Sequence, residues 1–521
     1  MKDAVTPFLK KNIFFICCLL VFATSVFFRV YRFSDKEDLF IDEYFSVILA
    51  HYNDFGWGKY VEDTIAFKGQ DIRSLFLSGD NSFAEIVSNV DSLHKITRDS
   101  PHTNLYYSLL KISFWRADTS DLGQIMERGF ILNLILFSVG FLFLLLMSLR
   151  LFDSKLLTVC LLAMAFINPG AIANTMFLRP YQLQETLLIL YTYMFVRCYI
   201  AIGDNTIRFA TWQNMLSIAL ISALGILSGY FSILYIFLLC VILLFRIMLK
   251  SGKDNAVFFI FTMLLSFIFV FFIYNGYLSG IFDYRGEEAL SKFGRDGFAD
   301  NWTDSMRGMS REIKDYLGYP SYVYIFLALL LFAFIRKMPR EKYSLLTLGV
   351  SLCAFVWIVA VIYLAPYKNI RYMLPMFPIF LLFIPGTYSL YSRKIQLMLV
   401  LVSVGWITYK AIKRDDVYIE YSSIDKTYVQ DKDVPLILGA IDGWKQVAKM
   451  RYYTDDRTVE FAFDPATFLN KIEKYPESYA IIDADSAARY IFPDTARFIY
   501  EEKTNPHGFV WYKLIKKDSF Q

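Results

Sequence analysis

The chain has 521 residues, of which 56% are hydrophobic and 18% aromatic, and its mean hydropathy is +0.40. A soluble protein of this length has a smaller apolar share and more charge, so a soluble enzyme or scaffold is excluded. The net charge of +4 is too small to indicate a nucleic-acid partner. The composition therefore predicts a polytopic α-helical membrane protein.

About eleven apolar runs approach the roughly 20 residues that a membrane helix needs. The first run follows three lysines, but no small-residue cleavage site comes after it, so we interpret it as an uncleaved membrane helix and not as a signal peptide. The runs are 12–28, 130–149, 156–175, 181–202, 213–229, 231–249, 256–278, 321–335, 343–364, 372–390 and 395–412.

Lysine and arginine are concentrated in alternate short loops, which predicts the orientation. If the N-terminus is cytoplasmic, the inner loops hold Arg150, Lys155, Arg197, Arg208, Arg246, Lys250, Lys253, Arg336, Lys337, Arg340, Lys342, Arg393 and Lys394. This orientation places three larger segments outside, namely the loops 29–126 and 279–320 and the tail 414–521. We expect a transmembrane domain over 1–413 and a separate extracytoplasmic domain over 414–521.

The tail 414–521 is expected to be a small α/β domain. The segments "PLILGA" and "YAIIDA" have the pattern of buried strands, and "TARFIYEEK" with "FVWYKLIKK" predicts a final strand pair. Helices are expected at "DGWKQVAKMRYY" and "DPATFLNKIEKY", the second with Asp464 as N-cap and Pro465 at its first position. Because the tail has no phosphate-binding glycine motif, we expect a supporting or docking role.

An acidic pair, Asp42-Glu43 in "LFIDEYFS", begins an apolar stretch in the first outer loop. In one interpretation Asp42 caps an interfacial helix and Glu43 favours the positive end of that helix. In the other, the pair is catalytic and provides a general base that accepts a proton from a hydroxyl nucleophile. The two interpretations are compatible, because a capped helix would hold the base in place.

The segment "RDSPHTNLYYSLLK" carries His102, Tyr106 and Tyr107. It has the pattern of an interfacial helix with an aromatic belt, and the same residues could line a substrate cavity. His51, His94 and His102 place three of the four histidines in this loop, so a divalent metal held with the acidic pair is an open alternative. The histidine spacing matches no ligand motif and the six cysteines form no CxxC pair, so we predict no metal and no cofactor.

Two further segments place cations at the outer ends of helices. Arg179 lies in "LRPYQLQ", and Lys368 and Arg371 lie in "YKNIRYMLP". Such side chains can extend to lipid headgroups, or they can bind a phosphate group. The adjacent Tyr181 and Tyr372 are further candidates for the substrate cavity.

In this order the four segments resemble the polyprenyl-phosphate-dependent membrane glycosyltransferases of the GT-C fold. The chain is most similar to the bacterial protein O-mannosyltransferase-like group, which includes the aminoarabinose-transferase-like enzymes. The matching motifs are the acidic pair, "SPHTNLYYSLL", "LRPYQLQ" and "IRYMLPMFP". The chain departs from the family where His102 precedes Thr-Asn and not two prolines, and where Pro180 follows Arg179.

The resemblance implies a multi-pass enzyme of the bacterial inner membrane. It would transfer a sugar from a polyprenyl-phosphate donor to a hydroxyl of a glycolipid, glycan or protein, with inversion. It implies Asp42 as general base, Glu43 as its support, and Arg179, Lys368 and Arg371 as ligands of the lipid phosphate. Two alternatives stay open: a transporter or flippase for a lipid-linked or anionic solute, and a non-catalytic envelope-assembly protein.

Overall fold

The computed structural model describes most of the chain in two compact units. Unit 1 comprises Met1–Asp35, Ser92–Leu109 and Phe130–Tyr418, and unit 2 comprises Lys36–Asp91, Leu110–Gly129 and Ile419–Gln521. Each unit is described by itself. The described residues are 2–62, 66–99, 102–204, 211–282, 287–288, 291, 302–308, 310, 344–365, 369–413, 433–439, 443–483, 498–505 and 509–517.

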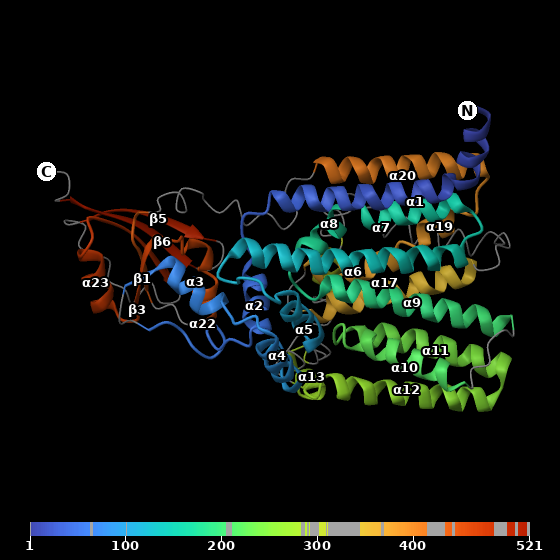
Figure 1. Ribbon diagram of the computed structural model, residues 1–521, viewed down its shortest axis with the longest axis horizontal. Coiled ribbons are helices and arrows are strands. Elements are labelled where there is room, and N and C mark those ends of the chain that lie inside the picture. The colour runs from blue at the N-terminus through green and yellow to red at the C-terminus, as the bar shows by residue number, and fades with distance from the viewer. Residues whose placement is uncertain are drawn as a thin grey trace. The chain divides into compact units, whose positions relative to one another are not determined.

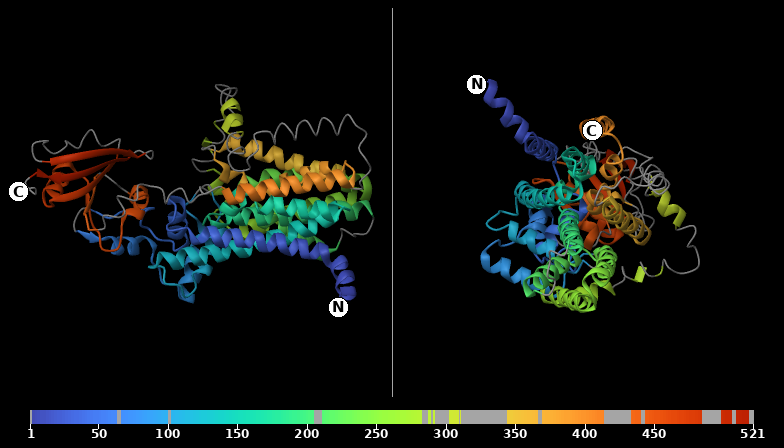
Figure 2. Two further views of the ribbon diagram at one scale, coloured as in Figure 1. Left: turned by 90° about the horizontal axis from the view of Figure 1, so that it is seen from above. Right: turned by 90° about the vertical axis from the view of Figure 1, so that its right-hand side faces the viewer.

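Unit 1 is built from long apolar helices that run side by side (Figures 1 and 2). Its helices are α1 (Lys2–Ser34), α6 (Leu122–Leu151), whose first turns belong to unit 2, α7 (Lys155–Phe166), α8 (Pro169–Met176), α9 (Tyr181–Gly203), α10 (Trp212–Ile226), α11 (Ser232–Ser251), α12 (Lys253–Ile273), α13 (Tyr277–Ile281), α17 (Ser344–Leu364), η1 (Ile370–Tyr372), η2 (Leu374–Met376), α18 (Phe377–Phe380), α19 (Phe383–Tyr388) and α20 (Arg393–Lys413).

Among the described residues, eight helices are long and apolar enough to cross a membrane, or up to nine if a bent pair counts as one span. The bent pair is α7 and α8, which enclose an angle of 55°. The predicted run at 213–229 forms the shorter helix α10, and the run at 321–335 lies outside the described residues. The multi-pass helical architecture is therefore confirmed, whereas the expected number of eleven spans is not.

The segments at the centre of unit 1 differ from those at its periphery. In Ile370–Tyr388, 83% of the apolar window is buried inside the protein, against 28% in α12 and α20. The peripheral helices expose large apolar side chains, such as Leu249 on α11 and Phe272 on α12, as expected for helices that face lipid. The expected helix 372–390 is a chain of short helical pieces, because Pro375 and Pro378 each remove a backbone donor.

Unit 2 contains one sheet of six strands in the order β1-β3-β2-β4-β6-β5 (Figure 1). The strands are β1 (Phe67–Lys68), β2 (Leu436–Gly439), β3 (Thr458–Ala462), β4 (Glu477–Asp483), β5 (Phe498–Asn505) and β6 (Phe509–Lys516). The strand β2 pairs in parallel with β3 and β4, and the other pairs are antiparallel. The tail helices are α22 (Gly443–Val447), η4 (Met450–Tyr452) and α23 (Pro465–Glu473), and α23 packs on β2 and β3.

Several predictions for the tail are confirmed. The strands β2 and β6 lie within their predicted segments, and β4 and β5 overlap theirs with shifted ends. Asp464 is the N-cap of α23, because its Oδ1 accepts hydrogen bonds of 3.0 Å from the amides of Ala466 and Thr467, and Pro465 takes the first helical position. The strand β3 was not predicted.

Most of the first loop belongs with the tail to unit 2, whereas Ser92–Leu109 belongs to unit 1. Strand β1 of the loop pairs with β3 of the tail, with Phe67 opposite Val459. The loop also supplies α2 (Ile41–Ala50) and α3 (Gly69–Leu77), and it continues through α4 (Phe83–Lys95) and α5 (Asn104–Ser113). Gln446 of α22 exchanges two hydrogen bonds of 2.9 Å with the backbone of Val61. The expected division into 1–413 and 414–521 places this loop in the membrane domain instead.

Candidate active site

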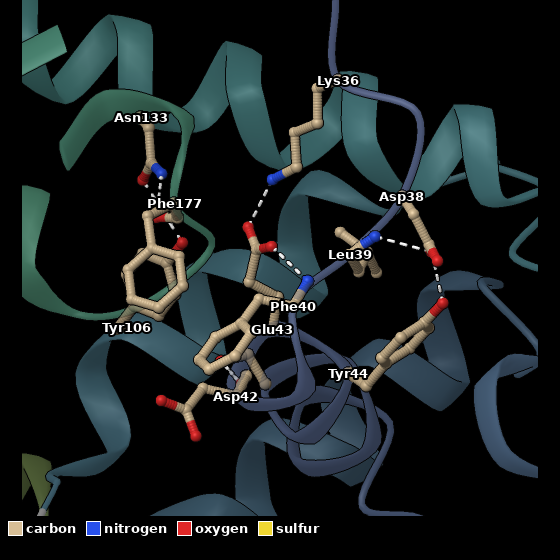
Figure 3. A network of polar contacts seen from close by, with 11 residues as sticks. Lys36, Asp38, Leu39, Phe40, Asp42, Glu43, Tyr44, Tyr106, Asn133 and Phe177 are labelled. Carbon is tan, nitrogen blue, oxygen red and sulfur yellow. Dashed lines mark hydrogen bonds and ion pairs between the residues drawn. The ribbon is translucent and has the colours of Figure 1, made fainter. Parts of the chain in front are cut away.

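The acidic segment, residues 36–50, belongs to unit 2 and contains helix α2 (Figure 3). Phe40 is the N-cap of this helix. Glu43 reaches back to it, since its Oε2 accepts a hydrogen bond of 2.7 Å from the Phe40 amide. Its Oε1 binds the Lys36 Nζ at 2.5 Å, and Glu43 is 1% exposed. The expectation that Asp42 caps the helix is therefore wrong: Asp42 lies within the first turn, and Glu43 makes the capping contact.

The two neighbouring carboxylates point in different directions. Figure 3 shows the Glu43 carboxylate turned toward Lys36 and the Phe40 amide, whereas the Asp42 carboxylate points away from the Glu43 carboxylate. Asp42 is partly exposed, and its backbone carbonyl accepts a hydrogen bond of 3.1 Å from the Ser46 hydroxyl. Adjacent positions on a helix differ by about 100° in direction, so the two acids serve different surroundings.

A third acid, Asp38, anchors the acidic segment within unit 2. Its Oδ1 accepts hydrogen bonds from the Leu39 amide at 2.7 Å and from the Tyr44 hydroxyl at 2.5 Å (Figure 3). Its Oδ2 lies 3.7 Å from Nε of Arg451 in the tail. Burial raises the pKa of Asp38 although these partners oppose the effect. Sequence analysis missed this residue, because its cationic partner lies far along the chain.

A second group of polar residues lies in unit 1 around Arg179, and we call Asp99, Tyr107 and Arg179 the Arg179 cluster. The Arg179 Nη1 donates to the Tyr107 hydroxyl at 3.3 Å, and its Nη2 lies 3.5 Å from Oδ2 of Asp99. The Tyr107 hydroxyl donates to the same Asp99 oxygen. Arg179 is 7% exposed. This burial excludes the alternative in which Arg179 extends to lipid headgroups.

Burial raises the pKa of the Tyr107 phenol well above its usual value, although the positive charge of Arg179 opposes the effect. Tyr107 therefore keeps its proton at neutral pH and acts as a hydrogen-bond donor to Asp99. Asp99 was not singled out by sequence analysis, although it lies in the quoted segment "RDSPHTN". A carboxylate three residues before His102 was the available signal.

Three aromatic rings, of His102, Tyr181 and Tyr372, lie next to one another in unit 1. The Tyr181 ring packs edge to face on the rings of His102 and Tyr372, with distances between ring centres of 5.8 and 5.9 Å. Arg371 lies over the Tyr372 ring at 5.2 Å, and its Nη2 donates to the Tyr372 hydroxyl at 3.4 Å. Tyr181 opens α9 two residues after Arg179. The fold thus brings together two arginine-bearing segments that are far apart in the sequence.

The other predicted site residues have different surroundings. Tyr106 is buried and its hydroxyl donates to Oδ1 of Asn133 at 3.3 Å, while the Asn133 amide donates to the Phe177 carbonyl at 2.9 Å (Figure 3). Tyr106 therefore supports the backbone just before Arg179. Lys368 lies outside the described residues.

The histidines have separate partners. His51 in unit 2 lies 2.9 Å from the Lys111 Nζ, which also donates to Oδ1 of Asn81. His94 in unit 1 lies 2.9 Å from the carbonyl of Ile273. In the part of the chain that the structure describes, no three or more His, Cys, Asp or Glu side chains lie close enough together to hold a metal ion.

The arrangement in unit 1 has the chemistry of an anion site. Arg179 directly precedes one candidate span, Tyr181–Gly203, and Arg371 lies at the start of another, Ile370–Tyr388. One guanidinium is balanced by Asp99, so the two arginines and this acid together retain positive charge. Guanidinium groups bind phosphate oxygens through parallel hydrogen bonds. Asp42 and Glu43 belong to the other unit.

No family model and no curated protein matches the chain. Among solved structures it is similar to ArnT from Cupriavidus metallidurans bound to undecaprenyl phosphate, with a TM-score of 0.49, 10% identity, and coverage of 95% of this chain and 97% of that one. It is also similar to the archaeal oligosaccharyltransferase AglB from Archaeoglobus fulgidus in complex with an inhibitory peptide and a dolichol-phosphate, with a TM-score of 0.47, 10% identity, and coverage of 97% and 74%. These TM-scores are below 0.5, so the function is argued from the residues of this chain.

Proposed function

We propose that this protein is an integral-membrane glycosyltransferase that moves a sugar from a polyprenyl-phosphate donor to an acceptor hydroxyl. The observation that carries the proposal is the Tyr181–Tyr372 ring contact, which joins the two segments that carry Arg179 and Arg371 near the starts of two membrane spans. A lipid-linked donor has its phosphate at the membrane surface and its apolar chain between the helices. Cations at helix ends suit such a ligand better than they suit a soluble one.

In the proposed reaction, the acceptor oxygen attacks the anomeric carbon of the donor sugar from the side opposite the phosphate. The new carbon–oxygen bond forms as the bond to the phosphate oxygen breaks, so the configuration inverts. The hydroxyl proton passes to the Asp42 carboxylate. The departing polyprenyl phosphate carries the negative charge, which Arg179 and Arg371 stabilise.

Glu43 has a supporting part in this proposal. Its carboxylate is engaged by Lys36 and by the Phe40 amide, which keeps the first turn of α2 in place. A base on a fixed turn needs no reordering when the acceptor arrives. We further propose that the reaction takes place on the extracytoplasmic face of a bacterial inner membrane, in the modification of an envelope glycolipid, glycan or protein.

The proposal is tested with the full-length chain in nanodiscs and a radiolabelled polyprenyl-phosphate sugar, with membrane glycolipid fractions as acceptors. We expect transfer by the wild type, with a raised KM for the donor in Arg371→Gln and partial recovery in Arg371→Lys. Arg393→Gln is the matched control, because Arg393 also lies at the start of a membrane helix and is exposed. A wild type that neither transfers sugar nor binds undecaprenyl phosphate would contradict the proposal.

A transporter or flippase for a lipid-linked or anionic solute is the second candidate. The observation that favours it is a pair of opposite charges within membrane spans, Arg29 on α1 and Glu185 on α9, which are 0% and 1% exposed. Reconstituted liposomes that translocate a fluorescent lipid-linked sugar, with no glycosidic transfer to any acceptor, would favour this alternative.

A further inference from the structure

The helix break between α7 and α8 needs hydrogen-bond partners. The chain turns by 55° there, and Pro169 occupies the first turn of α8. Asn168 supplies part of the repair: its Oδ1 accepts from the Ala171 amide at 2.8 Å, and its Nδ2 donates to the carbonyls of Met164 and Ala165 at 2.9 and 2.8 Å. Unpaired backbone groups at such a break are costly inside a membrane protein.

Arg29 of α1 supplies further donors. Its Nη1 donates to the carbonyl of Phe166, the last residue of α7, at 2.9 Å. Its Nη2 donates to the carbonyl of Ala171 in α8 at 3.1 Å. Its Nε donates to the Thr175 hydroxyl oxygen at 2.9 Å. The guanidinium also lies 3.9 Å from the centre of the Phe137 ring. One side chain therefore bonds both helices of the bent pair.

The contacts continue from α8 into α9. The Thr175 hydroxyl donates to Oε1 of Gln182 at 2.8 Å, and the Gln182 Nε2 donates to Oε1 of Glu185 at 3.0 Å. Asn174 donates to Oε2 of Glu185 at 3.2 Å. All of these side chains are buried, with exposures of 0–1%. Arg29 and Glu185, two buried charges within membrane spans, are thus the ends of one hydrogen-bonded chain.

This network brackets residues 177–180, the loop that carries Arg179. Arg29 and Thr175 hold the helix before the loop, and Gln182 with Glu185 holds the helix after it. We propose that Arg29 is a positioning residue: through Thr175, Gln182 and Glu185 it sets the bend of α8 and thereby the placement of Arg179. What Arg179 binds rests on the proposed function, whereas the bracing of its loop does not.

An arginine is suited to this position and a lysine is not. The three acceptors lie on two helices, and the planar guanidinium donates to them from Nε, Nη1 and Nη2 at the same time. A lysine ammonium donates from a single atom. Arg29→Lys keeps the charge and is expected to brace the loop only in part, and Arg29→Met removes both charge and donors.

The same helix offers a matched control. Arg32 lies one turn further along α1 and also bonds backbone carbonyls, but those of Ala411 and Ile412 at the end of α20, at 3.2 and 3.1 Å. We therefore compare Arg29→Met with Arg32→Met by hydrogen–deuterium exchange of the full chain in nanodiscs. We expect about tenfold faster exchange over 166–182 in the first variant only, and faster exchange over 405–413 in the second only.

Thr175→Val is the milder second variant, because it keeps the side-chain shape and removes the hydroxyl that joins Arg29 to Gln182. It should also speed exchange over 166–182, by less than Arg29→Met does. Unchanged exchange over 166–182 in both variants would overturn the inference. The inference would also be overturned if Arg29→Met and Arg32→Met accelerated exchange in the same segments, because that would indicate a general loosening of the fold.

Kinetics separate positioning from mere stability. If Arg29 positions Arg179, Thr175→Val and Arg29→Lys raise the KM for the donor, about tenfold for the lysine variant, with kcat per folded molecule changed by less than about threefold. A purely structural role would reduce the folded fraction and leave KM unchanged, which would overturn the inference. A wild type without transfer would contradict the proposed function, and the exchange experiment would still decide the bracing.

Discussion

The acidic segment of unit 2 and the Arg179 cluster of unit 1 are built in opposite ways. Glu43 finds both of its partners, Lys36 and the Phe40 amide, within seven residues of itself. Arg179 finds its partners on α5 and on the segment before it, more than seventy residues away. Local contacts need only the helix to form, whereas the Arg179 contacts need the helices to pack.

This difference changes what each charged residue can be expected to do. In the acidic segment, one of two adjacent acids stabilises the helix start and the other points elsewhere (Figure 3). In the Arg179 cluster, the cation is paired with Asp99, and Arg371 lies on another segment against Tyr372. A charged motif therefore predicts a candidate, and its partners decide whether the residue stabilises the fold or is placed for a ligand.

The largest expected effect separates the two acids of the pair. Asp42→Asn should reduce transfer by about 10²- to 10⁴-fold, because it removes the proposed proton acceptor. Thermal unfolding should stay close to that of the wild type. Glu37→Gln is the control, since Glu37 is an exposed acid of the same segment. Wild-type transfer by Asp42→Asn would remove Asp42 from the reaction.

The next effect tests the charge balance of the Arg179 cluster. Asp99→Asn leaves the buried Arg179 without its acid, and we expect a loss of about 3–5 kcal/mol in the free energy of unfolding. Asp99→Leu combined with Arg179→Met should cost less than Asp99→Asn alone, because neither charge is left buried. Denaturant titrations of the double variant and of its single variants Asp99→Leu and Arg179→Met, beside Asp99→Asn, measure this coupling, and strictly additive losses would contradict the pairing.

A smaller effect is expected at the start of α2. Glu43→Gln weakens the contact to Lys36 and should cost about 1–3 kcal/mol, with transfer per folded molecule within about threefold of the wild type. Amide exchange over 41–50 and the transfer assay measure the two quantities. A loss of transfer as large as that of Asp42→Asn, with unchanged exchange, would assign Glu43 to the chemistry.

The smallest effect concerns pH and belongs to unit 2. Burial lowers the pKa of His51 to about 3, and the neighbouring Lys111 adds to the effect. The unfolded chain takes up a proton at His51 below about pH 6.5 and the folded chain does not, so stability falls as the pH decreases from there. At about pH 5.5 this proton uptake lowers the free energy of unfolding by about 1.4 kcal/mol. His51→Gln, which still accepts from Lys111, should remove this part of the pH dependence in unfolding measured from pH 5 to 7.

Some features followed from the sequence because they depend on neighbouring residues. Asp464 and Pro465 predicted the start of α23, and alternating apolar segments predicted four strands of the sheet. The capping of α2 was assigned to the wrong acid. The helix begins two residues earlier than a cap at Asp42 would require, because its N-cap is Phe40. Asp38 and Asp99 were missed, since their cationic partners Arg451 and Arg179 are distant in sequence.

The sequence by itself determined the membrane architecture, since apolar runs of sufficient length must form helices in lipid whatever their neighbours are. It also indicated Arg179 and Arg371, as cations at outer helix ends, and Asp42, as an acid that begins an apolar stretch of an outer loop. Only the tertiary structure decided that Arg179 is paired with Asp99 and that Arg29 bonds both helices before the loop of Arg179. These are contacts between segments that approach each other only when the helices and the sheet pack, and no local pattern records them.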